Sequence, residues 1–176
     1  MKTYFAFLLT LFVLLAGCAT SVTKDISVKA EADPKARFSG YKTYAWLGSA
    51  RIIEDADGTW EPPKYDADAE VKFLINSKLR DRGMEEVTSN PDLVVAFALG
   101  VDMDALKLKE DPKSKIKSLE NVPQGALVVI LVDAASGYVI WVGEAEAELQ
   151  KNMDDKIATE RLKYAITEMF KRIPSD

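Results

Sequence analysis

Apolar residues alternate with polar ones over much of the chain, and this period of two predicts β-strands. Ile26, Val28 and Ala30 occupy every second position, which predicts a first strand over Lys24–Ala32. Further strands are expected at Tyr41–Leu47, Met84–Val87, Leu93–Met103, Ala126–Val132 and Tyr138–Leu149. The short turn between the last two strands predicts a hairpin.

Two segments instead repeat apolar residues every three or four positions, as amphipathic helices do. The first helix is expected over Asp66–Arg82 with Gly83 as its stop, and the second is expected to begin at Asn152 or Asp154. Arg161 falls in the apolar stripe of the second helix, where it should be paired or extend its charged end to solvent. The whole pattern predicts an α+β domain, with a mostly antiparallel sheet of about five or six strands and two helices packed on one face.

Two longer segments lack a regular pattern. Gly48–Tyr65 is expected to be a loop, in which Trp60 either covers the core or contacts a ligand. Asp104–Asn121 is polar and is interrupted by Pro112, so we expect a hairpin that extends the flanking strands. Its lysines are either a solvated surface or a contact for anionic lipid headgroups or glycan.

The predicted hairpin at the end of the sheet is apolar on both faces near its turn. If residues 133 and 138 face each other, one face carries Leu127, Val129, Leu131, Tyr138, Ile140 and Val142. The opposite face carries Gly143 and Ala145, whose small size allows helices to approach closely. Because a sheet with one solvated face alternates apolar and polar residues, something must cover each side. We therefore predict that the face that carries Leu127 and Ile140 is a partner face, made by the six residues from Leu127 to Val142 given above. It would be covered by the Gly48–Tyr65 loop, another protein or a second copy.

The N-terminus has the pattern of a bacterial export signal. Lys2 is followed by an apolar run, Phe5–Ala16, which is too short to cross a bilayer as a helix. The run closes on Leu15-Ala16-Gly17-Cys18, which resembles a bacterial lipobox. That resemblance implies signal peptidase recognition of Leu15, Ala16 and Gly17, cleavage before Cys18, and acylation of Cys18 with fatty acids such as palmitate. The expected organisation is a signal peptide at 1–17, an acylated cysteine and tether at 18–23, and one α+β domain at 24–176.

The expected tether is short, and its length limits how far the domain can lie from the membrane. About five free residues reach less than about 20 Å, so the domain should lie against its own membrane. Ala19 after the acylated cysteine, in place of Asp, is typical of export to the outer membrane in enteric-type bacteria. We therefore expect a lipid-anchored protein at the inner leaflet of the outer membrane, facing the periplasm.

Composition excludes several kinds of chemistry. The formal net charge of −5 gives no overall basic surface, so a nucleic-acid partner is not expected. The chain has no histidine, and its only cysteine is Cys18, so Ser-His-Asp and Cys-His catalysis and zinc sites built on these residues are excluded. Asp55-Ala56-Asp57-Gly58 is similar to the start of a calcium loop, but the remaining ligands are missing. We expect neither a metal nor a cofactor.

Catalysis has one further motif to consider. Ser39-Gly40-Tyr41-Lys42 matches the Ser-x-x-Lys pattern of penicillin-recognising enzymes, but so does Ser21-Val22-Thr23-Lys24, and the other elements of that class are missing. We therefore expect a non-catalytic binding or scaffolding lipoprotein whose partner is another envelope protein or a second copy. The alternatives are a carrier of a lipid or small apolar ligand and, less favoured, a cell-wall enzyme.

Two blocks of sequence resemble a known family. They are Asp33-Pro34 with Phe38-Ser39-Gly40-Tyr41-Lys42-Thr43-Tyr44-Ala45-Trp46, and Gly125-Ala126-Leu127-Val128-Val129, Leu131-Val132-Asp133 and Val139-Ile140-Trp141-Val142-Gly143 with Ala145. Both resemble the bacterial lipoprotein family of domain of unknown function 4136. The resemblance implies a lipobox followed by one compact α+β domain with no established biochemical role.

Overall fold

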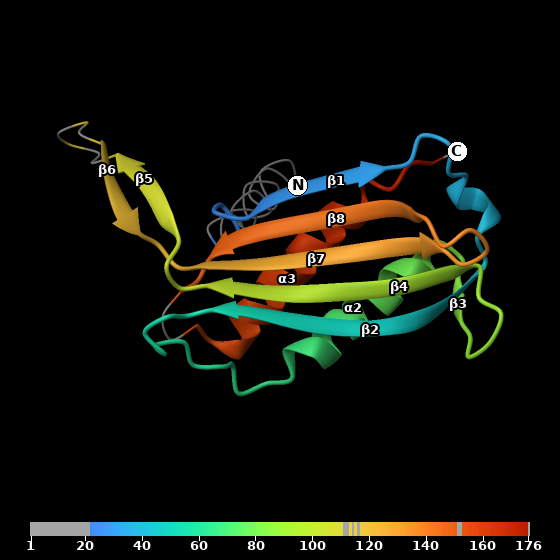
Figure 1. Cartoon of the computed structure of the whole chain (residues 1–176), viewed down its shortest axis with the longest axis horizontal. Helices are drawn as coiled ribbons and strands as arrows, with labels where there is room; N and C mark the ends of the chain where they lie inside the picture. Colours follow the sequence, from blue (N-terminus) through green and yellow to red (C-terminus); the bar gives the residue numbers. More distant parts are fainter. Residues whose placement is uncertain (1–21, 111–112, 114, 116, 151–152, 176) are drawn as a thin grey trace, which may run out of the picture.

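Strands of the main sheet lie in front of two helices, and a two-stranded hairpin projects from one end of the sheet (Figure 1). This computed structural model describes residues 22–110, 113, 115, 117–150 and 153–175. The strands are β1 (Ser27–Ala32), β2 (Thr43–Glu54), β3 (Glu85–Glu86), β4 (Leu93–Asp102), β5 (Leu106–Glu110), β6 (Lys117–Asn121), β7 (Gln124–Asp133) and β8 (Val139–Glu148). The helices are η2 (Phe38–Gly40), a short 3-10 turn, α2 (Ala67–Asp81) and α3 (Asp155–Phe170).

The main sheet is mixed, in the order β1-β8-β7-β4-β2-β3. The α+β class is confirmed, but the prediction of a mostly antiparallel sheet is wrong. β2 runs parallel to both β3 and β4, whereas the other three neighbouring pairs are antiparallel. The reason is the position of α2 in the chain. A helix between two strands returns the chain to the end at which the first strand began, so the next strand runs in the same direction.

The predicted loop is shorter than expected, because β2 continues through its first part. Residues 48–54 pair with β4 as far as Glu54 opposite Asp102. A β-bulge near Leu47 and Gly48 shifts the register, so the sequence does not alternate regularly there. Asp104–Asn121 does contain the expected hairpin, but β5 and β6 form a separate two-stranded sheet instead of extending β4 and β7.

Both helices lie where the periodicity of the sequence predicts them. The carboxylate of Asp66 accepts a hydrogen bond from the Ala69 amide at 3.0 Å and so caps α2, while Asp154 caps α3 through the Lys156 amide at 2.8 Å. Gly83 takes a φ of 78°, which suits the residue that follows a helix. The two helices contact each other and pack on the same face of the sheet (Figure 1).

The core lies between the sheet and these helices, and Trp141 is its largest fully buried side chain. Its ring lies 5.4 Å from that of Phe170, centroid to centroid. Gly143 makes room for the indole. A Cβ atom at this position would lie 2.8 Å from Trp141 Cζ2 and 2.9 Å from Met169 Sδ. The prediction that small residues of this strand permit a close helix is confirmed at Gly143.

Candidate functional site

The six residues of the predicted partner face do not form one open surface. Leu127, Val129, Leu131 and Ile140 are at most 5% exposed, whereas Tyr138 is 74% exposed. The predicted register holds at the turn, where the Asp133 amide donates to the Tyr138 carbonyl and Val132 lies opposite Val139. Leu131 then pairs with Trp141, which leaves Ile140 in a β-bulge. Beyond the bulge, Trp141, Gly143 and Ala145 therefore share the buried face with Leu131, Val129 and Leu127, whereas Val142 shares the open face with Ile130, because a slip of one residue exchanges the two faces of a strand.

One apolar face of the sheet is nevertheless left without a helix. Across β4, β7 and β8, two rows run Val94-Val132-Val139 and Ala96-Ile130-Val142. We call these six residues, with Val128, the open sheet face. In the described part of the chain neither α2 nor α3 covers it, since both lie behind the sheet in Figure 1. Val139 at its end is 51% exposed.

Along the strands, the open sheet face changes from apolar to acidic residues. Beyond Val142, the same face of β8 carries Glu144, Glu146 and Glu148. Lys29 of β1 lies directly opposite Glu144. The apolar rows therefore lie near the β7–β8 turn, and the acidic row lies at the end of the sheet from which β5 and β6 project.

The β5–β6 hairpin, which we call the arm, has two different faces. The leucine face carries Leu106, Leu108 and Leu119, with Asn121, Glu110 and Lys117 at its ends, and the polar face carries Lys107, Lys109, Ser118 and Glu120. Leu108 pairs with Leu119, and Leu106 lies on the same face two residues earlier; the exposed fractions of these three side chains are 61%, 69% and 65%. The side chains of Lys107 and Lys109 lie on the opposite face of the hairpin. The Nζ atoms of Lys109 and Lys107 lie 2.6 Å and 3.8 Å from Glu148 Oε1. The polar face thus rests on β8, and the leucine face points away from the domain.

The start of the described chain is held to α3 by a partly buried ion pair. Arg161 donates to both carboxylate oxygens of Asp25, at 2.8 Å and 2.6 Å, and to the carbonyl oxygens of Val22 and Glu148. Only 6% of the Arg161 side chain is exposed, so the prediction that it is paired is confirmed. The hydrogen bonds from Arg161 hold the pKa of the Asp25 carboxyl below its usual value of 3.8.

The remaining predicted site residues separate into two groups. Leu15, Ala16, Gly17 and Cys18 lie outside the described residues. Trp60 is half-buried, and its amide donates to Asp55 Oδ2 at 2.8 Å. The backbone amides of Trp60 and Thr59 lower the pKa of the Asp55 carboxyl, so this carboxylate braces the loop. Within the described residues, no group of three or more His, Cys, Asp or Glu side chains could hold a metal ion.

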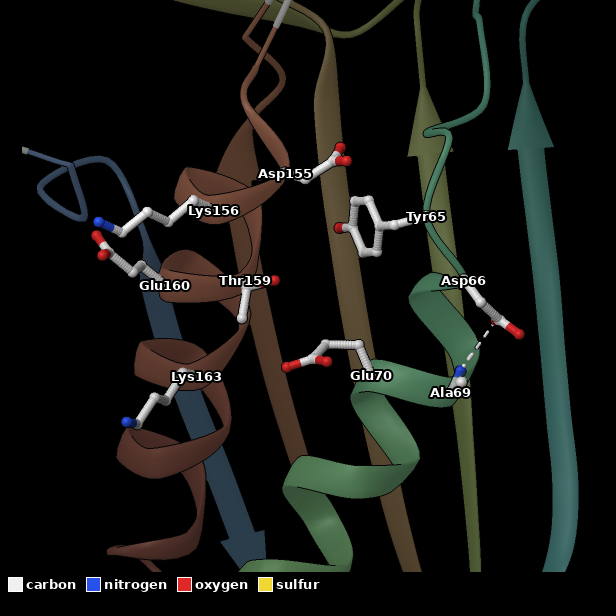
Figure 2. A pocket seen from close by; sticks show the side chains of 9 residues that line it. All are labelled: Tyr65, Asp66, Ala69, Glu70, Asp155, Lys156, Thr159, Glu160 and Lys163. Atoms are coloured by element: carbon white, nitrogen blue, oxygen red, sulfur yellow. Dashed lines mark hydrogen bonds between the residues drawn. The ribbon is translucent and has the colours of Figure 1, made fainter.

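A groove of about 590 Å³ lies between the first turns of α2 and α3 (Figure 2). Six of its nine lining residues are charged: Asp66, Glu70, Asp155, Lys156, Glu160 and Lys163. Tyr65 extends into the space between the two helices (Figure 2), and burial raises the pKa of its hydroxyl. The acidic residues stabilise the positive N-terminal ends of both helices. An apolar ligand there would desolvate these charges, so the groove does not favour a lipid carrier.

A second cavity, of about 400 Å³, lies at the corner where the two resemblance blocks meet. The Tyr41 hydroxyl donates to Asp133 Oδ2 at 3.0 Å, which joins the first block to the second. Asp92 accepts from the amides of Lys42 and Thr43 at 2.8 Å and 2.9 Å. The Lys42 and Thr43 amides lower the pKa of the Asp92 carboxyl, and hydrogen bonds from the Ser136 hydroxyl and amide are the main reason that the pKa of the Asp133 carboxyl is lowered. Sequence reasoning missed Asp92, although its turn motif Ser-Asn-Pro-Asp was visible, because its partners lie about 50 residues away.

Neither long helix of the described chain is apolar enough over sufficient length to cross a membrane. The family model described as domain of unknown function (DUF4136) matches residues 28–175. A DUF4136 family protein from Bacteroides thetaiotaomicron is 10% identical, with a TM-score of 0.54 over 84% of this chain and 95% of that chain.

Two other solved structures align with similar shares of this chain. A PDZ domain protein from Parabacteroides distasonis is 13% identical with a TM-score of 0.50, over 86% of this chain but 37% of that one. A PelC dodecamer from Paraburkholderia phytofirmans is 15% identical with a TM-score of 0.46, over 82% and 97%. No curated protein matches the sequence. At these identities the likenesses extend to the fold alone.

Proposed function

This chain belongs to the DUF4136 family of domains of unknown function, and from that premise we propose that it is a lipid-anchored, non-catalytic binding or scaffolding protein of the bacterial cell envelope. The membership itself supplies no mechanism, so the proposal rests on the chain's own features. Acylated Cys18 holds the protein at the inner leaflet of the outer membrane, and the domain faces the periplasm. Its partner is another envelope protein or a second copy.

The open sheet face is the single observation that carries the binding role. A sheet with one face in water normally carries polar side chains there. Here Ile130 and Val142 are neighbours in one row, with Val132 and Val139 in the next. An apolar patch that spans three adjacent strands is typical of a surface that binds another molecule. Since α2 and α3 pack on the opposite face, the cover has to come from another part of the chain or from a partner.

Crosslinking in intact cells tests this role. A photo-reactive amino acid at Val139, which is 51% exposed, should form a discrete crosslinked species on illumination. Phe73 is the matched control, since it is apolar, 60% exposed and lies on α2. If Val139 forms no product, or if both positions form the same products, the open sheet face is not a specific binding surface. Mass spectrometry of the product distinguishes a second copy from another envelope protein, and a co-purifying lipid would favour the carrier alternative.

The anchor is tested separately. Leu15-Ala16-Gly17-Cys18 supports acylation, and two acyl chains on one cysteine hold a protein stably at a bilayer. Cys18→Ser should therefore release the protein from the membrane fraction or leave its signal uncleaved. Membrane fractionation and a mature mass that are unchanged by this substitution would contradict the lipid anchor.

A further inference from the structure

We propose that the arm inserts its leucine face, Leu106, Leu108 and Leu119, into the surface of the bilayer that holds the lipid anchor. This inference rests on the proposed anchoring at Cys18. Three leucines on one face of a narrow hairpin, each more than 60% exposed, place a large apolar surface in water. A bilayer is the apolar phase within reach of this end of the molecule, as the contacts at the base of the arm indicate.

The arm lies at the end of the domain where the tether begins. The Asp25 carboxylate accepts a hydrogen bond from the Glu148 amide at 3.0 Å, and the Glu148 side chain accepts one from Lys109 at 2.6 Å. One residue of β8 therefore joins the start of the domain to the polar face of the arm. Figure 1 shows the same arrangement, since β1 begins at the end of the sheet from which β5 and β6 project.

The length of the tether places this end close to the bilayer. Only three residues separate Cys18 from Val22, the first described residue. Four steps along a fully extended chain reach about 14 Å. Val22 is itself fixed, because its carbonyl accepts from Arg161. The anchor therefore leaves the domain little freedom to turn this end away from the membrane.

Other exposed apolar side chains gather at the same end. Ile52 and Ile53, at the end of β2, are 58% and 48% exposed. The Met103 amide donates to the Glu54 carbonyl at 2.8 Å, and the Ala56 amide donates to Asp104 Oδ2, so the end of β2 is joined to the base of the arm. With the three leucines, this end holds five of the ten large apolar side chains that are exposed in the described chain. Such clustering favours a shared apolar environment over scattered surface positions.

Charge also favours the arm as the part that meets the membrane. The segment 104–121 contains five lysines and four carboxylates, whereas the whole chain has a net charge of −5. Anionic headgroups repel the acidic remainder of the protein and do not repel the arm. Lys107 and Lys109 face Glu148, so the leucine face enters the bilayer without burying these two charges. Glu110 and Lys117 lie on the leucine face beyond Leu108 and Leu119, where the apolar stretch ends.

A vesicle experiment tests the insertion apart from acylation. Residues 18–176 carry Cys18→Ser and an N-terminal hexahistidine, which ties them to phosphatidylethanolamine–phosphatidylglycerol vesicles that contain a nickel-chelating lipid. Leu108→Cys then provides the only thiol, which is labelled with an environment-sensitive fluorophore. Ser136→Cys in the β7–β8 turn, at the other end of the sheet, is the matched control. Lipids with nitroxide groups on their acyl chains report whether each probe lies within the bilayer.

We expect the probe at position 108 to shift its emission to shorter wavelength on vesicle binding and to be quenched by the nitroxide lipids, with neither change at position 136. Adding Leu106→Ser and Leu119→Ser should abolish both changes at position 108 without affecting the melting temperature, because both side chains are exposed. Equal behaviour of the two probes would overturn the inference. So would a blue shift without vesicles that grows with protein concentration, since it would indicate a second copy on the leucine face. Failure of acylation at Cys18 affects only the fractionation experiment, so the two failures are distinguishable.

Discussion

The ion pair between Arg161 and Asp25 should be a main source of stability, because it fastens the start of the domain to α3. Replacing Arg161 with Met removes the charge but fills the space with a flexible apolar side chain of similar length. The substitution deletes two hydrogen bonds to Asp25 and one each to the carbonyls of Val22 and Glu148. Asp25 then keeps its charge with no cation bonded to it.

The burial of Arg161 and Asp25 determines how much stability the substitution removes. Breaking a fully buried ion pair from one side costs about 3–5 kcal/mol, whereas an exposed pair contributes about 0–1 kcal/mol. Arg161 is 6% exposed and Asp25 is 24% exposed, so solvent screens part of the interaction. We therefore expect Arg161→Met to lower the free energy of unfolding by about 2–4 kcal/mol.

A double-mutant cycle isolates this contribution. The free energies of unfolding of Arg161→Met, Asp25→Ala and the double variant are measured in urea, with far-UV circular dichroism as the readout. The coupling energy should be about 1–3 kcal/mol. The pair of Arg51 and Asp68 is the matched control, since it joins β2 to α2 but is 46% and 32% exposed. Its coupling energy should stay below about 1 kcal/mol.

Equal coupling energies for the two cycles would refute this reasoning, because burial would then not distinguish the pairs. Hydrogen exchange gives a second readout. In Arg161→Met, the amides of Lys29 and Glu31 in β1, which point toward β8, should exchange faster, since Asp25 no longer fixes the residues before them. Unchanged exchange in β1, together with a large loss of stability, would place the role of Arg161 elsewhere in the core.

Two further predictions concern pH and packing. The pKa of the Asp25 carboxyl is lower in the folded chain, so the ion pair stabilises the protein above about pH 5, and this stabilisation is lost as the pH falls through the folded pKa. In urea unfolding between pH 5 and pH 3, the free energy of unfolding should therefore fall more steeply for the native chain than for Arg161→Met. Parallel losses of stability would contradict this. Gly143→Ala should lower the free energy of unfolding by about 1–3 kcal/mol, because its Cβ atom would overlap Trp141. Gly100→Ala is the control and should be nearly neutral, because its Cβ atom would lie 3.5 Å from its nearest neighbour. Equal melting temperatures for the two variants would contradict the packing described for Gly143.

Much of the local structure could be predicted from the sequence. Both helices, their acidic caps and the stop at Gly83 follow from interactions between residues that are near neighbours in the chain. Arg161 in an apolar stripe indicated a buried partner, because a charge is rarely buried unpaired. Its identity as Asp25 could not be predicted, since 136 positions separate them.

The binding surface shows where this reasoning failed. Both faces of the hairpin are apolar near its turn, which correctly indicated that one of them would lack a helix. The choice between the faces depended on a single residue, Ile140, whose bulge carries Val142 to the open side and Trp141 to the core. A bulge has no reliable sequence signal here, because the apolar residues on both sides of it would fit either register.

By itself, the sequence determined the kinds of element, their order, the excluded chemistries and the lipobox pattern that ends in Cys18, because each depends on residue identity or on spacing within a few turns or pleats. Tertiary structure decided the parallel pairing of β2 with β4, the separation of the arm from the main sheet, and the side of the hairpin that stays open. These features depend on contacts between segments far apart in the chain. Their energies are a property of the packed arrangement, so no local pattern in the sequence encodes them.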